Sequence, residues 1–203
     1  MLSHEKRKMM FWESLEHNIG SFPAIFVPIK GSSTTPGFAI RFIWATGTGF
    51  DHDASVLLRD PELLDTYWTV LDSFSKIIEP VNRHTLSVFP KDMDFLSTMN
   101  FQISGASLGL AMFAGLYLKL LGIHWPKGLW AWGNIRPVRN NSYLLYEVDK
   151  IKEKLEVASA YGVNSLLHQE CECGLLKRGL DIRVARDMSD IVQKISLLIK
   201  SGG

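Results

Sequence analysis

The stretch Gly105-Ala106-Ser107-Leu108-Gly109-Leu110-Ala111-Met112 opens the most apolar segment of the chain, which continues to about Leu121. Apolar side chains occupy nearly every position, so we expect a helix over 107–121 that is buried on all sides at the centre of the fold. The segment is too short to span a membrane, and Lys119 interrupts it. The glycines on either side of Ser107 predict a sharp turn into the helix and close packing of another backbone segment.

Strand and helix patterns alternate around this central segment. Asp60-Pro61 predicts a helix start, because Asp is a preferred N-cap and Pro is favoured at the first helical position. Gly122 and Gly162 are expected to end two of the helices. The mixture predicts an α/β (α+β) fold, a compact domain of small mixed sheets and packed helices. The expected helices cover 4–18, 61–79, 107–121, 148–161 and 187–199, the expected strands cover 24–29, 38–45, 55–58, 84–90, 129–132, 143–148, 163–167 and 180–184, and a turn-rich loop is expected at 136–142.

Length and composition predict one main domain. The chain has 203 residues, of which 46% are hydrophobic and 21% charged, which is ordinary for a globular protein. We therefore divide it into an N-terminal helical extension at 1–23 and a domain at 24–203.

The charge balance and the cysteines bound the partners and the compartment. With 22 basic and 21 acidic residues the net charge is +1, which argues against nucleic-acid binding. The N-terminus lacks the pattern of a signal peptide. Cys171 and Cys173 are expected to be reduced thiols, with His168 too isolated to complete a zinc site. We expect a cytoplasmic protein without metal, cofactor or membrane contact.

Ser107 is the clearest candidate for chemistry, because it stands at the start of the central helix. A serine hydroxyl needs a base to remove its proton and donors to stabilise the oxyanion that forms. A helix N-terminus supplies unpaired N–H groups and a positive dipole end. The alternative interpretation is that Ser107 is only a helix N-cap.

A lysine on the helix expected at 148–161 is the candidate base. Val148, Ile151, Leu155 and Ala158 form its apolar face, and Lys152 and Lys154 flank that face on opposite sides. Helical spacing alone does not choose between the two lysines, and an exposed lysine is the alternative for each. A base with a pKa near 7–8 would require burial, because the free amine has a pKa of about 10.4.

A Ser-His-Asp triad is a second way to activate the serine. His84 or His124 could serve in it, since such triads are recognised in space and not by sequence order. The sequence offers no clear acidic partner for either histidine.

Two motifs resemble the proteolytic domain of Lon proteases. The stretch Ala106-Ser107-Leu108-Gly109-Leu110-Ala111-Met112 is similar to the family's P-S-A-G-x-A-M serine motif. The stretch Ile151-Lys152-Glu153-Lys154-Leu155, with Ala158 and Gly162, is similar to its G-G-I-K-E-K-L motif and the A-A-x-x-x-G that follows. The resemblance implies the compact α/β fold of that family, which often assembles as a ring, and a serine/lysine dyad. Polyprotein-processing proteases of the birnavirus type are also similar.

The resemblance assigns roles to residues. It implies that Ser107 is the nucleophile, that Lys152 is the general base, and that backbone N–H groups at Ala106 and Ser107 bind the oxyanion. Trp132 falls in the place of a family threonine that supports the lysine, and we expect it to contact substrate. The chain departs from the family at Ala106, at Trp132 and at Asp149-Lys150, which replace a proline, a threonine and a glycine pair.

The expected function is therefore a serine endopeptidase with a Ser/Lys dyad that forms an acyl-enzyme. The chain has no G-x-x-x-x-G-K-[ST] segment, so its activity is expected to be independent of ATP. Its expected partners are protein or peptide substrates, and the resemblance allows a homo-oligomeric ring and an ATPase unfoldase acting in trans. The departures motivate an alternative, a catalytically inactive Lon-like module for assembly or binding. A third reading is a small-molecule kinase on a related fold.

Overall fold

A computed structural model describes residues 4–27, 37–47, 60–82, 85–91, 105–139, 142–146, 148–169 and 181–201. Helices and strands are interleaved along the chain, which confirms the α+β class. The elements in chain order are α1 (His4–Glu16), β1 (Ser21–Phe26), β2 (Phe38–Thr46), α2 (Pro61–Ile77), β3 (Leu86–Pro90), the 3-10 helix η3 (Ala106–Leu108), α4 (Gly109–Leu120), β4 (Leu129–Trp132), β5 (Asn134–Val138), β6 (Ser142–Tyr146), α5 (Ile151–Ala160), β7 (Ser165–Gln169), β8 (Asp181–Ala185) and α6 (Met188–Ser201).

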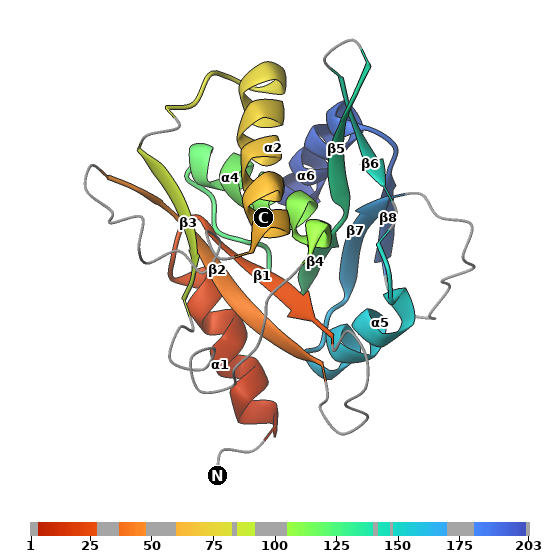
Figure 1. Ribbon diagram of the computed structural model, residues 1–203. Helices are drawn as coiled ribbons and strands as arrows, with labels where there is room; N and C mark the ends of the chain where they lie inside the picture. The colour runs from red at the N-terminus through yellow and green to blue at the C-terminus, as the bar shows by residue number, and fades with distance from the viewer. Residues whose placement is uncertain are drawn as a thin grey trace.

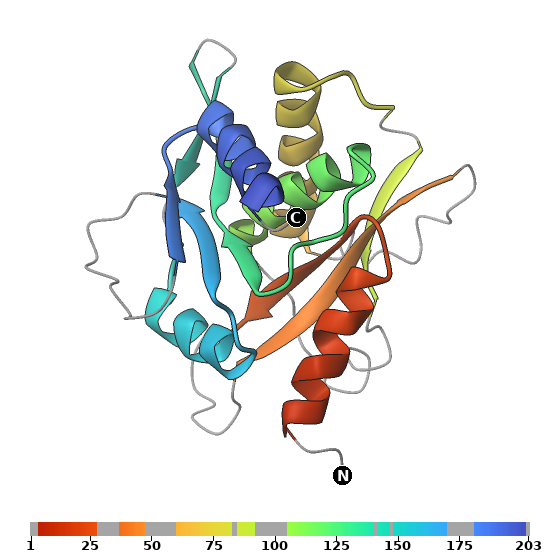
Figure 2. The ribbon, with the colours of Figure 1, turned by 180° about the vertical axis from the view of Figure 1, so that it is seen from behind.

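Helix α4 forms the centre of the core, as its uniformly apolar sequence predicts. Every residue from Gly109 to Leu116 is buried. The helix contacts β1 and β2 of one sheet and β4 of another, and Figures 1 and 2 show it between them in both views. It ends at Leu120, where the N–H of Gly122 donates to the carbonyl of Lys119, in agreement with the expected glycine cap. The segment that carries Ser107 is thus fixed by the core.

In the part of the chain that the structure describes, the strands form three small sheets. Strands β1, β2 and β3 make an antiparallel sheet in the order β1-β2-β3, so β1 lies at its edge. Strands β4, β7 and β8 make a parallel sheet in the order β4-β7-β8. Strands β5 and β6 form a two-stranded antiparallel ribbon, in which Asn134 pairs with Tyr146 and Pro137 with Tyr143.

Several expected boundaries differ from the observed ones. The loop expected at 136–142 is wrong, because β5 continues through Pro137 to Val138. A proline is tolerated there because, among the described residues, β5 pairs with β6 alone and lies at a sheet edge. Strand β1 begins at Ser21 and not at 24. The strand expected at 55–58 lies outside the described residues.

Helix α1 contributes to the same core as the rest of the chain. Phe11, Trp12 and Leu15 are buried in it, and the Trp12 indole donates to the Tyr161 carbonyl oxygen at 2.8 Å. The Phe11 ring stacks on that of Trp130, with ring centroids 6.1 Å apart. The helical extension proposed for 1–23 therefore packs against the domain that follows it.

Helix starts agree well with the capping signals. The Asp60 carboxylate accepts from the N–H groups of Glu62 and Leu63 at 2.9 and 3.0 Å, which confirms it as the N-cap of α2. The N–H of Asp190 donates to the Asp187 carboxylate at 2.9 Å at the start of α6. Within the described residues, no helix is both long and apolar enough to cross a membrane.

Candidate functional site

Ser107 lies in η3, the 3-10 turn that leads directly into α4. Gly105 precedes this turn with φ +152°, a value that residues with a side chain rarely adopt. The carbonyl of Ser107 accepts from the Gly133 N–H at 3.0 Å, and the Gly133 carbonyl accepts from the Leu110 N–H at 3.0 Å. A Cβ at Gly109 would stand 3.3 Å from the Ile135 nitrogen, so the second glycine permits this close approach of β5. Both glycines act as the sequence predicts.

The hydroxyl of Ser107 does not cap the helix. The N-cap position of α4 belongs to Leu108, and no side chain makes a capping hydrogen bond there. The interpretation of Ser107 as a helix N-cap is therefore wrong. Its hydroxyl lines a cavity instead.

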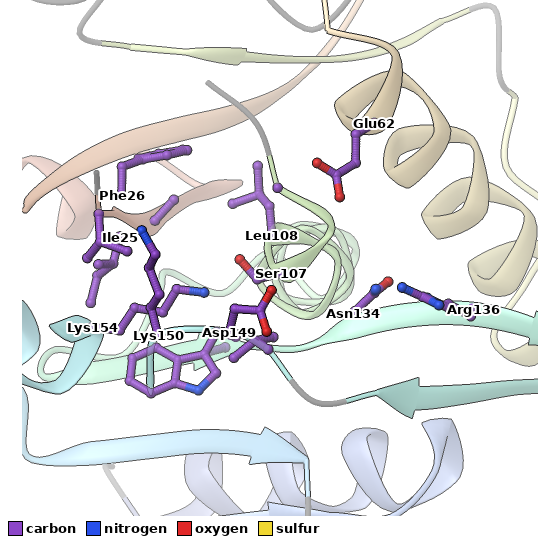
Figure 3. Close-up of a pocket in the computed structure, with 16 residues that line it drawn as sticks. Ile25, Phe26, Glu62, Ser107, Leu108, Asn134, Arg136, Asp149, Lys150 and Lys154 are labelled. Carbon is purple, nitrogen blue, oxygen red and sulfur yellow. The ribbon is translucent and has the colours of Figure 1, made fainter. Parts of the chain in front are cut away.

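This cavity, of about 400 Å³, lies where β1, α2, η3, β4, β5 and the start of α5 meet. Figure 3 shows Ser107 in the middle of it, at the near end of α4. One part of the wall is apolar and comes largely from the edge strand β1 and the residue after it. The lining residues are Ala24, Ile25, Phe26, Val27, Glu62, Gly105, Ser107, Leu108, Ala131, Trp132, Asn134, Arg136, Val148, Asp149, Lys150 and Lys154.

Lys154 is the lysine that faces Ser107. Its side chain is only 7% exposed, and Figure 3 shows its amine pointing toward the Ser107 hydroxyl. Burial lowers the pKa of Lys154 from 10.5 to about 8; the negative charge of Asp149 opposes this shift and the positive charge of Lys150 adds to it. Within the described residues, its amine forms no hydrogen bond and no ion pair. It can therefore act as an acceptor once it loses its proton.

Lys152 lies on the other side of α5. Its side chain is exposed and does not line the cavity. Lys152, which the family resemblance implies to be the general base, therefore lies away from Ser107. Lys154 lines the same cavity as Ser107.

The start of α5 explains the difference between the two lysines. The expected helix began at 148, but α5 begins at Ile151, because Lys150 adopts a left-handed conformation with φ +56°. Val148 is therefore not part of the apolar face of the helix, whereas Val157 is buried. At about 100° per residue, removing the first and adding the second turns the inward face toward Lys154.

Two charged residues stand beside Lys154 where the Lon family has glycines. Asp149 and Lys150 both line the cavity, and Figure 3 shows them between α5 and Ser107. Lys150 is the only residue other than glycine with positive φ among the described residues. Such a conformation costs of order 1–3 kcal/mol for a residue with a side chain. The Lys150 carbonyl accepts from the Lys154 N–H at 3.0 Å, which places the two lysines one turn apart.

Two further residues expected at the site are Ala106 and Trp132. The backbone of Ala106 forms the first residue of η3, next to Ser107. The N–H groups of Leu108 and Leu110 already donate to the carbonyls of Gly105 and Gly133, whereas no acceptor for the N–H groups of Ala106 and Ser107 is found among the described residues, so both remain candidate donors for an oxyanion. Trp132 lines the cavity at 4% exposure, and no hydrogen-bond partner of its indole N–H is found in the described part of the chain.

The remaining candidates do not join this site. His124 is exposed and does not line the cavity, and His84 lies outside the described residues. Trp125 and Trp130 are fully buried in the core. Among the described residues, no group of three or more His, Cys, Asp or Glu side chains could hold a metal ion; Cys171 and Cys173 are not among those residues.

A scan against protein-family models finds no matching family, and a search of the curated proteins finds no matching relative. The similarity to Lon proteases therefore rests on the two short motifs alone. The function has to be argued from the site itself.

Proposed function

We propose that this protein is a serine peptidase that uses Ser107 as nucleophile and Lys154 as general base. The observation that carries the proposal is the buried Lys154 amine, which has no ion pair among the described residues and points toward the Ser107 hydroxyl in a shared cavity. A pKa of about 8 lies close to the range in which a general base is most effective. Burial of a lysine amine lowers the stability of the folded protein. Groups with pKa values perturbed in this way cluster at functional sites.

The reaction proceeds through an acyl-enzyme. The neutral Lys154 amine accepts the proton of the Ser107 hydroxyl while the oxygen forms a bond to the carbonyl carbon of the peptide. The oxyanion is stabilised by the N–H groups of Ala106 and Ser107. Collapse of the intermediate breaks the C–N bond, and the Lys154 ammonium gives its proton to the leaving amine. Lys154 then removes a proton from water, and the water oxygen forms a bond to the ester carbonyl carbon. As the bond from this carbon to the Ser107 oxygen breaks, the Lys154 ammonium returns the proton to that oxygen.

The edge strand β1 suits the binding of an extended peptide. Among the described residues it pairs with β2 alone, and four consecutive residues from Ala24 to Val27 line the cavity. Main-chain hydrogen bonds to a sheet edge hold a peptide with little dependence on its side chains. We therefore propose that substrate adds as a strand beside β1, with its scissile carbonyl over Ser107.

Replacement of Ser107 tests this proposal. The Ser107→Ala variant is expected to lose peptide cleavage entirely, together with covalent labelling of the protein by a fluorophosphonate or peptide-aldehyde probe. Ser189→Ala is the matched control, because Ser189 is exposed at the start of α6, and it should keep both signals. Cleavage retained by purified Ser107→Ala would contradict the mechanism. A wild-type protein that neither cleaves peptides nor reacts with the probes would favour the non-catalytic binding module.

A further inference from the structure

A second cavity, of about 350 Å³, lies between α2 and β5. It adjoins the candidate active site, because Glu62, Asn134 and Arg136 line both cavities. The second cavity is lined by Glu62, Asp65, Thr66 and Thr69 of α2 and by Asn134, Ile135, Arg136 and Pro137 of β5. A peptide that crosses Ser107 could therefore place a side chain between α2 and β5.

The two sides of Ser107 differ in chemistry. Figure 3 shows Ile25 and Phe26 of β1 on one side of the serine, and Glu62, Asn134 and Arg136 on the other. The first side is an apolar wall with the lysines below it. The second side is polar and leads into the second cavity. The residues that flank a scissile bond would thus meet two different environments.

Asn134 places its amide where the two cavities meet. It is only 7% exposed, yet within the described residues its side chain makes no hydrogen bond. Because Asn134 lines both cavities, its amide is open to a ligand that enters either of them. Its oxygen can accept from a donor in either cavity.

Acceptors outnumber cationic donors in the second cavity. Glu62 and Asp65 contribute carboxylates, and within the described residues the Asp65 carboxylate makes no hydrogen bond or ion pair. The Thr66 hydroxyl already donates to the Glu62 carbonyl at 2.8 Å. The single cation, Arg136, places its guanidinium 5.2 Å from the centre of the Tyr146 ring on β6. The net charge of the lining is negative, which matches a cationic ligand.

We infer that the cavity between α2 and β5 binds a lysine or arginine side chain of the substrate, while the β1 wall takes an apolar side chain on the opposite side of the scissile bond. The cation pairs with Asp65 and donates to the Asn134 oxygen, and the nearby charge of Glu62 adds to the attraction. This inference rests on the proposed function, since it assigns specificity to the same site.

Cleavage-site mapping tests the inference. Peptides prepared from a whole proteome are incubated with the protein, and the new termini are identified by mass spectrometry. We expect Lys and Arg to be enriched on one side of the cleaved bond and apolar residues on the other. Asp65→Lys should lower the Lys/Arg preference about five-fold, the size expected for one partly exposed ion pair. Glu156→Lys makes the same charge change on an exposed position of α5 and should leave the preference unchanged. Equal preferences in wild type and Asp65→Lys would overturn the inference.

A binding measurement separates this inference from the peptidase proposal. Ser107→Ala is titrated with two fluorescein-labelled alanine-based octapeptides that carry either one lysine or one glutamate, and anisotropy is recorded. Tighter binding of the lysine peptide, lost on adding Asp65→Lys, supports the subsite even if wild type cleaves nothing, an outcome that would contradict only the peptidase proposal. No difference between the two peptides would overturn the subsite, whatever the activity.

Discussion

Helix α5 carries two lysines, separated by one residue, in opposite environments. Lys152 projects into solvent, whereas Lys154 is buried in a cavity beside Ser107. The two residues have the same side chain and lie on the same helix, so only their positions on it differ. The comparison shows that position on the helix decides which lysine is buried, and burial lowers the pKa of Lys154 to about 8. The sequence motif indicates Lys152, whereas the cavity beside Ser107 contains Lys154.

Replacing each lysine by methionine gives the largest expected effect. Lys154→Met removes the proposed base and should lower the rate of peptide cleavage by about 10²–10⁴-fold, the usual contribution of general acid–base catalysis. Lys152→Met is the matched control, with the same substitution on the exposed face, and should stay within about two-fold of wild type. The measurement is the initial rate of cleavage of one labelled peptide at pH 8.5.

The reverse result would restore the assignment made from the motif. If Lys152→Met were inactive and Lys154→Met active, the helix would have to turn about its axis in the working enzyme. Equal loss in both would point to a structural effect, which circular dichroism of the two variants would detect.

The same pair should differ in stability. Lowering the pKa of Lys154 from 10.5 to about 8 corresponds to about 3 kcal/mol of folding free energy at neutral pH. Between these two values the unfolded chain binds more protons than the native protein, so the free energy of unfolding rises with pH from about 8 to 10.5. Lys154→Met should therefore stabilise the protein at pH 7, and its advantage should shrink as the pH passes through that window.

Urea denaturation at pH 7 and pH 10.5 measures this difference. Lys152→Met should change the free energy of unfolding by no more than about 0.5 kcal/mol at either pH. A Lys154→Met variant that is no more stable than wild type at pH 7 would mean that the native protein already solvates this amine.

Local signals in the sequence account for most of the fold. Asp60 fixes the start of α2, because its carboxylate accepts hydrogen bonds from two N–H groups of the first helical turn. This interaction is local and requires no tertiary contact. The uniformly apolar segment places α4 in the core, since no face of it could be left in water. Gly105 and Gly109 frame Ser107 through backbone geometry alone.

The site was less predictable, because its residues meet only in the tertiary structure. A left-handed Lys150 shortens α5 and shifts the inward face toward Lys154, and no simple pattern predicts that conformation for a lysine. Asn134 and Asp65 lie on elements far apart in the chain and become neighbours only when α2 packs on β5. The family resemblance favoured Lys152 because it compares residue types along a motif. Such a comparison does not show which side chain is buried.

Removing the charges beside Lys154 should give the smallest effects, which are shifts in the pH dependence of cleavage. Wild-type cleavage is expected to rise with pH through a midpoint near 8, as Lys154 loses its proton. Asp149 stabilises the ammonium, so Asp149→Asn should move this midpoint to lower pH. Lys150 destabilises it, so Lys150→Gln should move the midpoint to higher pH.

Opposite shifts of about half a pH unit each are expected, the size of one charge interaction near a protein surface. Lys152→Gln removes an equal charge from the exposed face of α5 and should leave the midpoint in place. Glutamine also keeps a side chain at the left-handed position 150, so any shift there reports charge and not release of backbone strain. If Asp149→Asn and Lys150→Gln shift the midpoint in the same direction, the charges beside Lys154 do not act as proposed. If Lys152→Gln shifts the midpoint as much as they do, the pH dependence follows the overall charge of the protein. In either case the two faces of α5 would not differ in their effect on catalysis.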